Sequence, residues 1–493
     1  MWSSSSSGGW HLLATFAGVS SYGAGAGGGV DIGWYAPAST KLNNITAVVD
    51  GTGGVYDFIY NSSDTTRYGT YNWCNMPHVR KTEYVKAAKE YELVYVELIH
   101  RHHKRTPYAS NAFPVEPYHW NCDDQGLYFY GKPIDSKRKT PAAQTYWKGY
   151  LSAINPFVPS GWIGTCQFPQ ITTAGLDDSW QHGADLHDVY HDLLNFLPSR
   201  DSEKWRDRVV YRVTNNLITS QVAGMVINGM WNASREVPLL VQASTIDSLE
   251  PKYPCAKASF LFDKIKSNER WKEHLNAAKP LYSLLDNISG VPVTDNGFHE
   301  GLDHYYDNLS ARQCHQKPFP CKIVDGKNDT SECITQDMAN KAYRFGHWEY
   351  SHIYRDAGEM ALTASVASFG VWIAELAEHL REVMTEKQHV LWYHNIAHDG
   401  SVSRLLSVLQ VDEMVWPGMG AEVVFEQFYK KKQTSGGGGD GGYFVRVLFG
   451  GRVLTSSNPS LGVMDMIPVE TLLGYFDGLV GRGASLVAGK CGN

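Results

Sequence analysis

Apolar residues in the first half of the chain form short continuous runs that alternate with stretches of helical spacing. Residues 91–99 (YELVYVELI) and 209–213 are compact, largely β-branched runs, typical of strands buried on both faces of a mostly parallel sheet. Between them, residues 176–197 place leucine and valine at helical intervals. The alternation of strand and helix predicts an α/β fold.

The same rhythm returns in the second half, with a helix predicted over 369–384, a strand over 389–393 and a helix over 402–411. Residues 422–429 and 443–454 predict two strands joined by the glycine-rich run SGGGGDGG, which is typical of a flexible hairpin. Residues 221–350 instead combine irregular polar loops with short helical pieces. We therefore predict an insertion at 221–350, which divides the α/β core into residues 35–220 and 351–493.

Composition and charge exclude several classes of protein. Hydrophobic residues make up 43% of the 493 residues and charged residues 19%, which indicates a globular chain. The formal net charge is −7 and the basic runs are short and scattered, so neither nucleic acid nor an anionic membrane is an expected partner. No apolar stretch was counted that reaches the roughly 18 to 20 residues of a membrane span, so we expect a soluble protein.

Three features favour secretion. Residues 1–34 contain an apolar run at 10–19 and small residues at 24–26 that resemble a signal-peptide cleavage site, although no basic residue precedes Lys41 and a flexible tail is the alternative. The eight cysteines include no C-x-x-C pair, which favours disulfides of undetermined pairing. Six glycosylation sequons begin at Asn44, Asn61, Asn232, Asn287, Asn308 and Asn328. We predict a secreted, disulfide-bonded glycoprotein.

Five basic residues in a row, 101–105 (RHHKR), follow the predicted strand 91–99, where open α/β sheets bind ligands. Guanidinium groups grip phosphoryl oxygens, and an imidazole can act as nucleophile, so the run predicts an anion site. A solvated basic loop is the alternative. The histidines of this run could also bind a metal, but Arg101, Lys104 and Arg105 would repel a cation, so we expect no metal.

A second candidate pair, His398 and Asp399, lies between a predicted strand and the helix over 402–411. Asp399 could protonate a leaving oxygen, and His398 could hydrogen-bond a developing oxyanion. Asp399 could instead be a helix N-cap, because aspartate often precedes an apolar periodic run.

Three segments in this order resemble the histidine acid phosphatases. LVYVELIHRHHKRTP resembles their R-H-G-x-R-x-P signature after a buried strand, ITTAGLDDSWQHGADL resembles their L-T-x-x-G helix region, and AHDGSVSRLLSVLQV resembles their distal H-D motif. The resemblance covers roughly residues 91–448 and leaves the N-terminal segment outside.

This resemblance implies a mixed, mostly parallel sheet flanked by helices, with a smaller, mainly α-helical cap inserted over the strand ends. It also implies that His102 attacks phosphorus, that Arg101 and Arg105 hold the phosphate oxygens, and that Asp399, beside His398, protonates the leaving alcohol. It implies neither a metal nor another cofactor.

Two positions depart from the family pattern. His103 replaces the glycine after the nucleophile, so its ring either reshapes the floor of the site or packs away from it. Ile218 stands where a middle segment of the family supplies another phosphate-binding arginine. Arg212, Lys104 and Arg355 are candidates to replace that cation.

We therefore predict a secreted acid phosphatase acting on a small phosphomonoester through a phosphohistidine at His102, with His103 among the substrate-binding residues beside Arg101 and Arg105. Because a cation is missing, two alternatives stay open. The scaffold could hydrolyse a carbohydrate or another ester, or it could bind a ligand without turnover.

Overall fold

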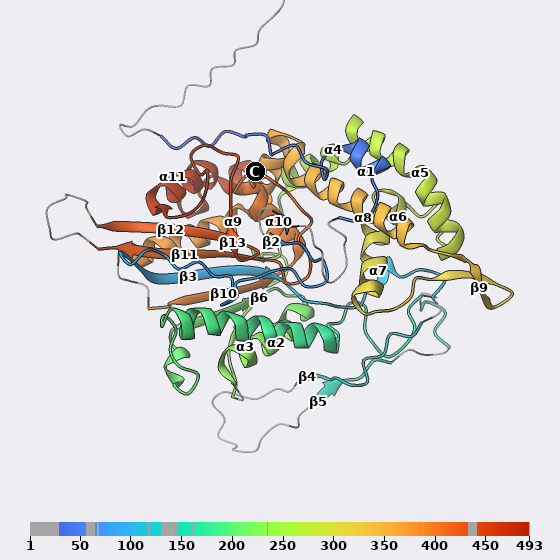
Figure 1. The fold of residues 1–493 in the computed structure, drawn as a ribbon, viewed down its shortest axis with the longest axis horizontal. Coiled ribbons are helices and arrows are strands. Elements are labelled where there is room, and N and C mark those ends of the chain that lie inside the picture. The colour runs from blue at the N-terminus through green and yellow to red at the C-terminus, as the bar shows by residue number, and fades with distance from the viewer. Residues whose placement is uncertain are drawn as a thin grey trace, which may run out of the picture.

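A central eight-stranded mixed sheet organises the protein (Figure 1). The computed structural model describes residues 29–55, 65–66, 69–116, 118–129, 143, 145–150, 152, 154–158, 161–233, 235–385, 387, 389–431 and 441–492. The strand order is β13-β12-β11-β3-β10-β6-β7, and β14 pairs with β12. The strands are β3 (Tyr91–Arg101), β6 (Val209–Val213), β7 (Leu239–Leu240), β10 (Trp392–Ala397), β11 (Glu422–Lys430), β12 (Gly442–Phe449), β13 (Arg452–Val453) and β14 (Ile467–Pro468).

Parallel pairing joins β3, β10, β6 and β7, whereas β11 runs antiparallel to β3 and to β12. The predicted mixed α/β sheet flanked by helices is therefore confirmed. Helices α2 (Thr173–His187) and α3 (Leu217–Trp231) cover one face, and α9 (Glu359–Met384), α10 (Asp399–Val408) and α11 (Val469–Val480) cover the other (Figure 1). Side chains of β3 alternate between the two apolar clusters on these faces, Val96 and Leu98 in one and Tyr95 and Ile99 in the other.

A mainly helical region lies beyond the strand ends. It comprises α4 (Ala256–Ile265), α5 (Glu269–Ser289), α6 (Asn296–His299), α7 (Asp303–Cys314), the hairpin β8 (Cys321–Val324) and β9 (Lys327–Cys333), and α8 (Gln336–Ser351). The predicted insertion starts at residue 221, but that position lies inside α3, which packs on the sheet, and β7 still belongs to the sheet. The helical region thus begins about 35 residues later than the sequence pattern places it.

Most predicted core elements are present, with shifted ends. β6 has the predicted bounds. β10 begins three residues later than the predicted strand and overlaps it at residues 392 and 393, and α9 begins ten residues before the predicted helix. The shorter elements are α1 (Ile45–Asp50), β1 (Thr65–Thr66), β2 (Gly69–Thr70), η1 (Ala109–Asn111), β4 (Leu127–Phe129), β5 (Thr145–Trp147), η2 (Asp188–Leu193), η3 (Glu203–Trp205), η4 (His352–Asp356), η5 (Arg482–Ala484) and α12 (Val487–Lys490).

Helix α9 contradicts one expectation from the sequence. Its length and composition would allow it to cross a membrane, whereas the sequence pattern predicts no apolar stretch of that length. However, 78% of its most apolar 18-residue window is buried within the protein, against α4, α10, α11 and β3. We therefore interpret α9 as a core helix on the face of the sheet that α10 and α11 also cover.

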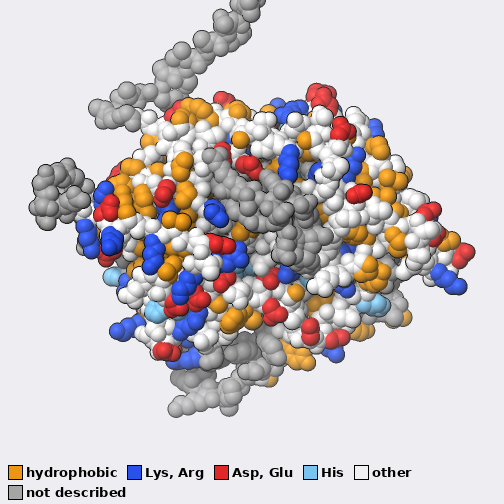
Figure 2. Space-filling model, viewed as in Figure 1, with side chains coloured by type: hydrophobic (Ala, Val, Ile, Leu, Met, Phe, Trp, Pro, Cys, Tyr) orange, Lys and Arg blue, Asp and Glu red, His pale blue; other side chains and the backbone are white. Residues whose placement is uncertain are grey.

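On the face that Figure 2 shows, Lys and Arg side chains are interspersed with Asp and Glu.

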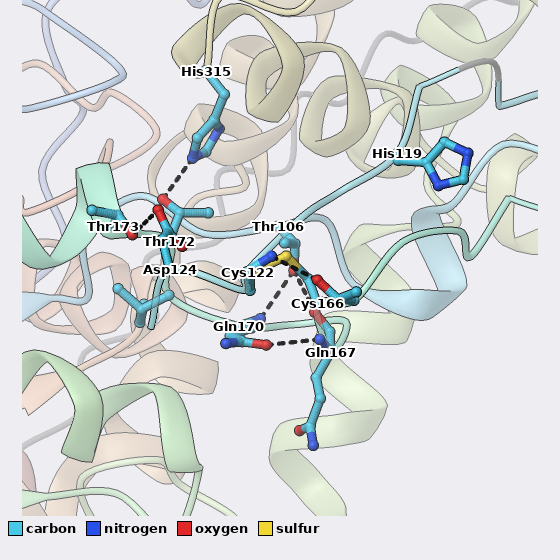
Figure 3. The surroundings of a disulfide bond; sticks show 12 residues. Thr106, His119, Cys122, Asp124, Cys166, Gln167, Gln170, Thr172, Thr173 and His315 are labelled. Atoms are coloured by element: carbon cyan, nitrogen blue, oxygen red, sulfur yellow. Dashed lines mark hydrogen bonds between the residues drawn. A yellow bond between two sulfur atoms is a disulfide. The ribbon is translucent and has the colours of Figure 1, made fainter. Parts of the chain in front are cut away.

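All eight cysteines form disulfides, as the sequence predicts. The pairs are Cys74–Cys314, Cys122–Cys166, Cys255–Cys491 and Cys321–Cys333. Beside Cys122–Cys166, the Thr106 hydroxyl donates to the carbonyl of Gln167 (2.9 Å) and accepts from the amide of Gln170 (3.0 Å; Figure 3). These bonds fix the chain directly after the basic run.

The N-terminal prediction falls mostly outside the described residues, because residues 1–28 are not among them. Residues 29–34, which the sequence analysis assigns to the same segment, pack against the core through Val30 and Trp34, and Gln410 donates to the carbonyl of Gly33 (2.7 Å). The folded part thus includes at least residues 29–34.

The sequons differ in exposure. The asparagine is exposed at Asn44, Asn232, Asn287 and Asn328, and Asn61 lies outside the described residues. Asn308 in α7 is 1% exposed, and its amide donates to the carbonyl of Asn111 (2.7 Å). A glycan cannot occupy Asn308 in the folded protein.

Candidate active site

The two predicted motifs meet at one edge of the sheet. β3 and β10 are adjacent and parallel, with Ala397 opposite Arg101, so both strands end together. The amide of His102 donates to the carbonyl of Ala397 (3.0 Å), and the rings of His102 and His398 lie edge to face with centroids 5.5 Å apart. The topology therefore brings together residues almost three hundred positions apart in the sequence.

His102 is held in one tautomer. Its Nδ1 lies 3.0 Å from the carbonyl oxygen of His103, which can only accept, so Nδ1 carries the proton and Nε2 carries the lone pair. The side chain is 1% exposed. Burial, with Arg101 and Arg105 nearby, holds the pKa of His102 well below its usual value. The ring is therefore neutral and has an unprotonated Nε2, the state that a nucleophile requires.

Arg101 faces Asp399 across the strand ends. Its Nη2 lies 3.1 Å from Asp399 Oδ2, and its Nη1 donates to the carbonyl of Pro417 (2.7 Å). The guanidinium also lies over the ring of Trp73, 4.9 Å from the centroid. Arg101 is almost fully buried, whereas the Asp399 side chain is 23% exposed, so the carboxylate is the more accessible member of the pair.

Asp399 is the first residue of α10, directly after the N-cap position. Its Oδ2 accepts from Trp416 Nε1 (2.9 Å) and from the hydroxyl of Tyr350 (3.4 Å), and its Oδ1 accepts from the amide of Gly400 (2.8 Å). Burial raises the pKa of Asp399, but Arg101 and the Trp416 hydrogen bond outweigh it, so the net pKa is lowered. The carboxylate of the free protein is therefore ionised.

Arg105 and Lys104 are also paired with carboxylates. Both terminal nitrogens of Arg105 contact Asp307 of α7, with Nη2 to Oδ1 at 3.0 Å and Nη1 to Oδ2 at 3.3 Å, and both side chains are buried. Lys104 Nζ lies 2.7 Å from Asp178 Oδ2. With Arg101 beside Asp399, each cation of the basic run has an acidic partner. The site is thus charge-balanced, whereas the run of basic residues alone predicts a cationic anion site.

His398 is fixed by neighbours on two further segments. Its Nε2 lies 3.0 Å from the hydroxyl of Thr214, which follows β6, and 3.5 Å from Oε2 of Glu250. The residue is buried. His398 is therefore oriented at the same edge of the sheet as His102 and is within contact distance of a carboxylate.

The His103 side chain packs inside the protein, against α2. Its ring contacts His182 of α2, with His103 Nε2 3.1 Å from His182 Nδ1. Gly420 makes room for it: a Cβ at Gly420, whose φ is +73°, would lie 2.5 Å from the His103 ring. His103 itself does not adopt a positive φ. Of the two expectations for His103, the geometry favours a ring that packs away from the substrate side.

Each candidate for the missing cation is engaged elsewhere. Ile218 is buried in the apolar cluster of α2 and α3. Arg212 pairs with Glu375 (2.7 Å), and Arg355 donates to the carbonyl of Val411 (2.8 Å). Lys104, as described above, is bound to Asp178. Arg101 and Arg105 therefore remain the guanidinium groups that the geometry places beside His102.

A cavity of about 690 Å³ with aromatic walls lies beside the segment after β6, which carries Thr214, the residue whose hydroxyl contacts His398. Asn216 and Leu217 form part of its wall, two and three residues after Thr214. Its aromatic lining consists of Trp147, Tyr150, Phe157, Trp162 and Phe168. The sequence offered no signal for this cavity, since these residues come from irregular segments and one short strand.

The partners of the motif residues were also missed. Asp307, Tyr350 and Trp416 come from α7, α8 and the segment before β11, and none lies in a pattern that marks it as functional. They become identifiable only when the helical region is placed over the strand ends.

No family model matches the chain. Counting factor 60 of Dictyostelium discoideum is 22% identical over 375 residues, which cover 73% of this chain and 80% of that protein. Among the similar solved structures are two phytases, each 12% identical to this chain. Hafnia alvei phytase has a TM-score of 0.51, covering 81% of this chain and 99% of its own, and Klebsiella phytase has a TM-score of 0.50, covering 80% and 96%. The chain therefore has the fold of these phytases.

Proposed function

We propose that this protein is a phosphatase of the histidine acid type, which hydrolyses a phosphomonoester through a phosphohistidine at His102. The observation that carries the proposal is the juxtaposition of a neutral, tautomerically fixed His102 with the Arg101–Asp399 pair. The fold of the phytases supports it. The individual roles of the residues are part of the proposal.

In the first step, His102 Nε2 attacks phosphorus and the bond from phosphorus to the ester oxygen breaks. Protonated Asp399 gives its proton to the departing oxygen, so that an alcohol leaves. Arg101 and Arg105 neutralise charge on the transferring phosphoryl oxygens. In the second step, water attacks the phosphohistidine, Asp399 takes a proton from that water, and the nitrogen–phosphorus bond breaks to release phosphate.

Charge balance gives this mechanism a preference for acid. Arg101 and Arg105 are already neutralised by Asp399 and Asp307, so a phosphate dianion adds uncompensated negative charge. A proton on Asp399 removes one of these charges and is also the proton that the leaving group needs. Substrate binding raises the pKa of Asp399 for the same reason, and acid pH favours both binding and turnover.

We propose further that the protein is secreted. The protein has four disulfides, which form and persist in oxidising compartments such as the secretory pathway. In addition, four of the sequon asparagines are exposed and thus accessible to glycosylation. The N-terminal segment resembles a processing signal and is the remaining support.

The test is phosphate release from an aryl phosphate and from phytate at mildly acid pH. His102→Ala and Asp399→Ala are compared with His119→Ala, because His119 is exposed whereas His102 is buried. Alanine is used at Asp399 because asparagine there would complete a glycosylation sequon with Ser401. We expect turnover that both motif variants lose and the control keeps. Turnover that survives both motif variants would exclude the mechanism.

A second candidate is favoured by the charge balance itself. A site in which each cation has a carboxylate suits a less anionic ester, and the neighbouring aromatic cavity could hold a sugar ring. In that case a glycoside or carboxylic ester is cleaved in a His102-dependent reaction while phosphate esters are not. Binding of such a ligand without turnover would identify a binding protein instead.

A further inference from the structure

Five histidines gather inside the protein, behind the floor of the candidate active site. They come from the segment before β3, from β3 and the basic run, from α2 and from β10, and all five are buried: His78, His100, His103, His182 and His394. Ring centroids of neighbouring members lie 4.2 to 5.9 Å apart. The proposed phosphatase reaction uses none of them.

Hydrogen bonds fix which nitrogens carry lone pairs. His100 Nδ1 donates to the carbonyl of Arg101 (2.8 Å), so His100 Nε2 is a lone pair, and among the described residues it has no hydrogen-bond partner. His182 Nε2 donates to Oε2 of Glu422 (2.9 Å), so His182 Nδ1 is a lone pair facing His103. His103 Nδ1 is likewise buried without a partner in the described part of the chain.

We propose that His100, His103 and His182 form a zinc site. One nitrogen from each ring lies within 4.8 Å of the others, so a small movement of the side chains brings all three to the Zn–N distance of about 2.0–2.1 Å. The ion would take up the lone pairs of His100 Nε2 and His103 Nδ1, which lack hydrogen-bond partners in the described part of the chain, and would replace the contact of His182 Nδ1 with His103. Neutral imidazoles suit Zn²⁺, whereas Mg²⁺ and Ca²⁺ prefer oxygen ligands.

The surroundings of the three rings match those of known metal sites. A histidine ligand usually donates its other nitrogen to a carboxylate or a backbone carbonyl. His182 does so to Glu422, and His100 does so to the carbonyl of Arg101. Glu422 is fully buried, and its other oxygen accepts from the amide of Val79 (2.6 Å), so the carboxyl group that orients His182 is itself fixed.

The cations of the basic run do not oppose this site. From the sequence alone, these cations are expected to repel a metal ion. In the structure each is paired with a carboxylate, which offsets its charge: Arg101 with Asp399, Lys104 with Asp178 and Arg105 with Asp307. The third ligand, His103, stands where the histidine acid phosphatase signature has glycine, and Gly420 leaves space for the His103 ring. A bound ion would tie the end of β3 to α2 and so hold the segment that carries His102.

The experiment measures metal content, not activity, so its outcome is independent of the proposed phosphatase. The full chain is produced in Zn²⁺-supplemented medium, purified and analysed by inductively coupled plasma mass spectrometry. We expect about one Zn²⁺ per chain in the wild type and in the exposed control His119→Gln, and at least a tenfold lower content in His103→Phe and His182→Gln. Circular dichroism establishes that the variants are folded.

Cobalt provides a second readout that needs only the wild type. Protein refolded with Co²⁺ should show the intense visible absorption of a tetrahedral site, and added Zn²⁺ should abolish it. Folded wild type with less than 0.1 Zn²⁺ per chain that also gives no such absorption would overturn the proposal. An unchanged zinc content in folded His182→Gln would overturn this ligand set.

Discussion

Replacing Asp307 by asparagine separates the cost of a buried charge from its effect on the ligand. Asp307 holds Arg105 through two contacts of 3.0 and 3.3 Å, and both side chains are buried. Removing one partner of a buried ion pair costs about 3–5 kcal/mol, and we expect about 3 kcal/mol here because asparagine keeps an acceptor oxygen. The variant should therefore lose this much in its free energy of unfolding.

The same change frees the guanidinium of Arg105 for phosphate. A charge-assisted hydrogen bond contributes about 1.5–3 kcal/mol, so inorganic phosphate should bind roughly 10- to 100-fold more tightly to Asp307→Asn than to the wild type. Phosphate at 100 times its dissociation constant adds about 2.7 kcal/mol to stability, and a fixed phosphate concentration should therefore restore more stability to the variant.

Two measurements test this pair of expectations. Isothermal titration calorimetry gives the phosphate affinity at mildly acid pH, and urea unfolding with and without phosphate gives the stabilities. Asp201→Asn serves as the matched control, since it removes the same charge from an exposed position. If folded Asp307→Asn binds phosphate no better than the wild type, Arg105 does not contact phosphate and the reasoning fails.

Three further predictions concern the acid, the glycans and one disulfide. Trp416→Phe removes a hydrogen-bond donor from Asp399 and should raise the pKa of Asp399. Because Asp399 must be protonated to act, the fall of kcat with rising pH should move to higher pH, and an unmoved profile would contradict the assigned acid. Peptide mapping of secreted protein should find no glycan at Asn308, while the modified positions are drawn from Asn44, Asn61, Asn232, Asn287 and Asn328. Replacing Cys255 and Cys491 together by serine should lower the free energy of unfolding by about 2–5 kcal/mol in chemical denaturation, because this bond closes a loop of 236 residues, and an unchanged midpoint would show that the bond does not form.

Local patterns predicted the core elements well where burial is uniform. The sheet buries β3 and β6 on both faces, so each forms a continuous apolar run that can be recognised directly in the sequence. The start of α9 was missed because residues 359–368 are mostly small residues, which show no clear spacing of large apolar side chains. The sequence pattern places the start of the insertion at residue 221, but α3 follows β6 and packs on the sheet, so the helical region begins only with α4.

The candidate site was predictable only in part, for a physical reason. His102 and His398–Asp399 follow strands and can be placed at a common edge from the order of elements. The residues that pair with Arg105 and Asp399 cannot be identified from the order of elements. Asp307 comes from the helical region and Trp416 from a loop before β11. Likewise, the direction of the His103 ring depends on the space that Gly420 leaves.

The central claim is a covalent phosphohistidine at His102, and trapping it is the most direct measurement. The protein is mixed with an aryl phosphate, quenched in alkali within milliseconds, digested and analysed by mass spectrometry under conditions that preserve phosphohistidine. The account predicts one phosphoryl group on His102, with a larger trapped fraction in Asp399→Ala if water attack slows more than phosphoryl transfer. Turnover of the substrate with no phosphoryl group on His102, or with one on another residue, would contradict it.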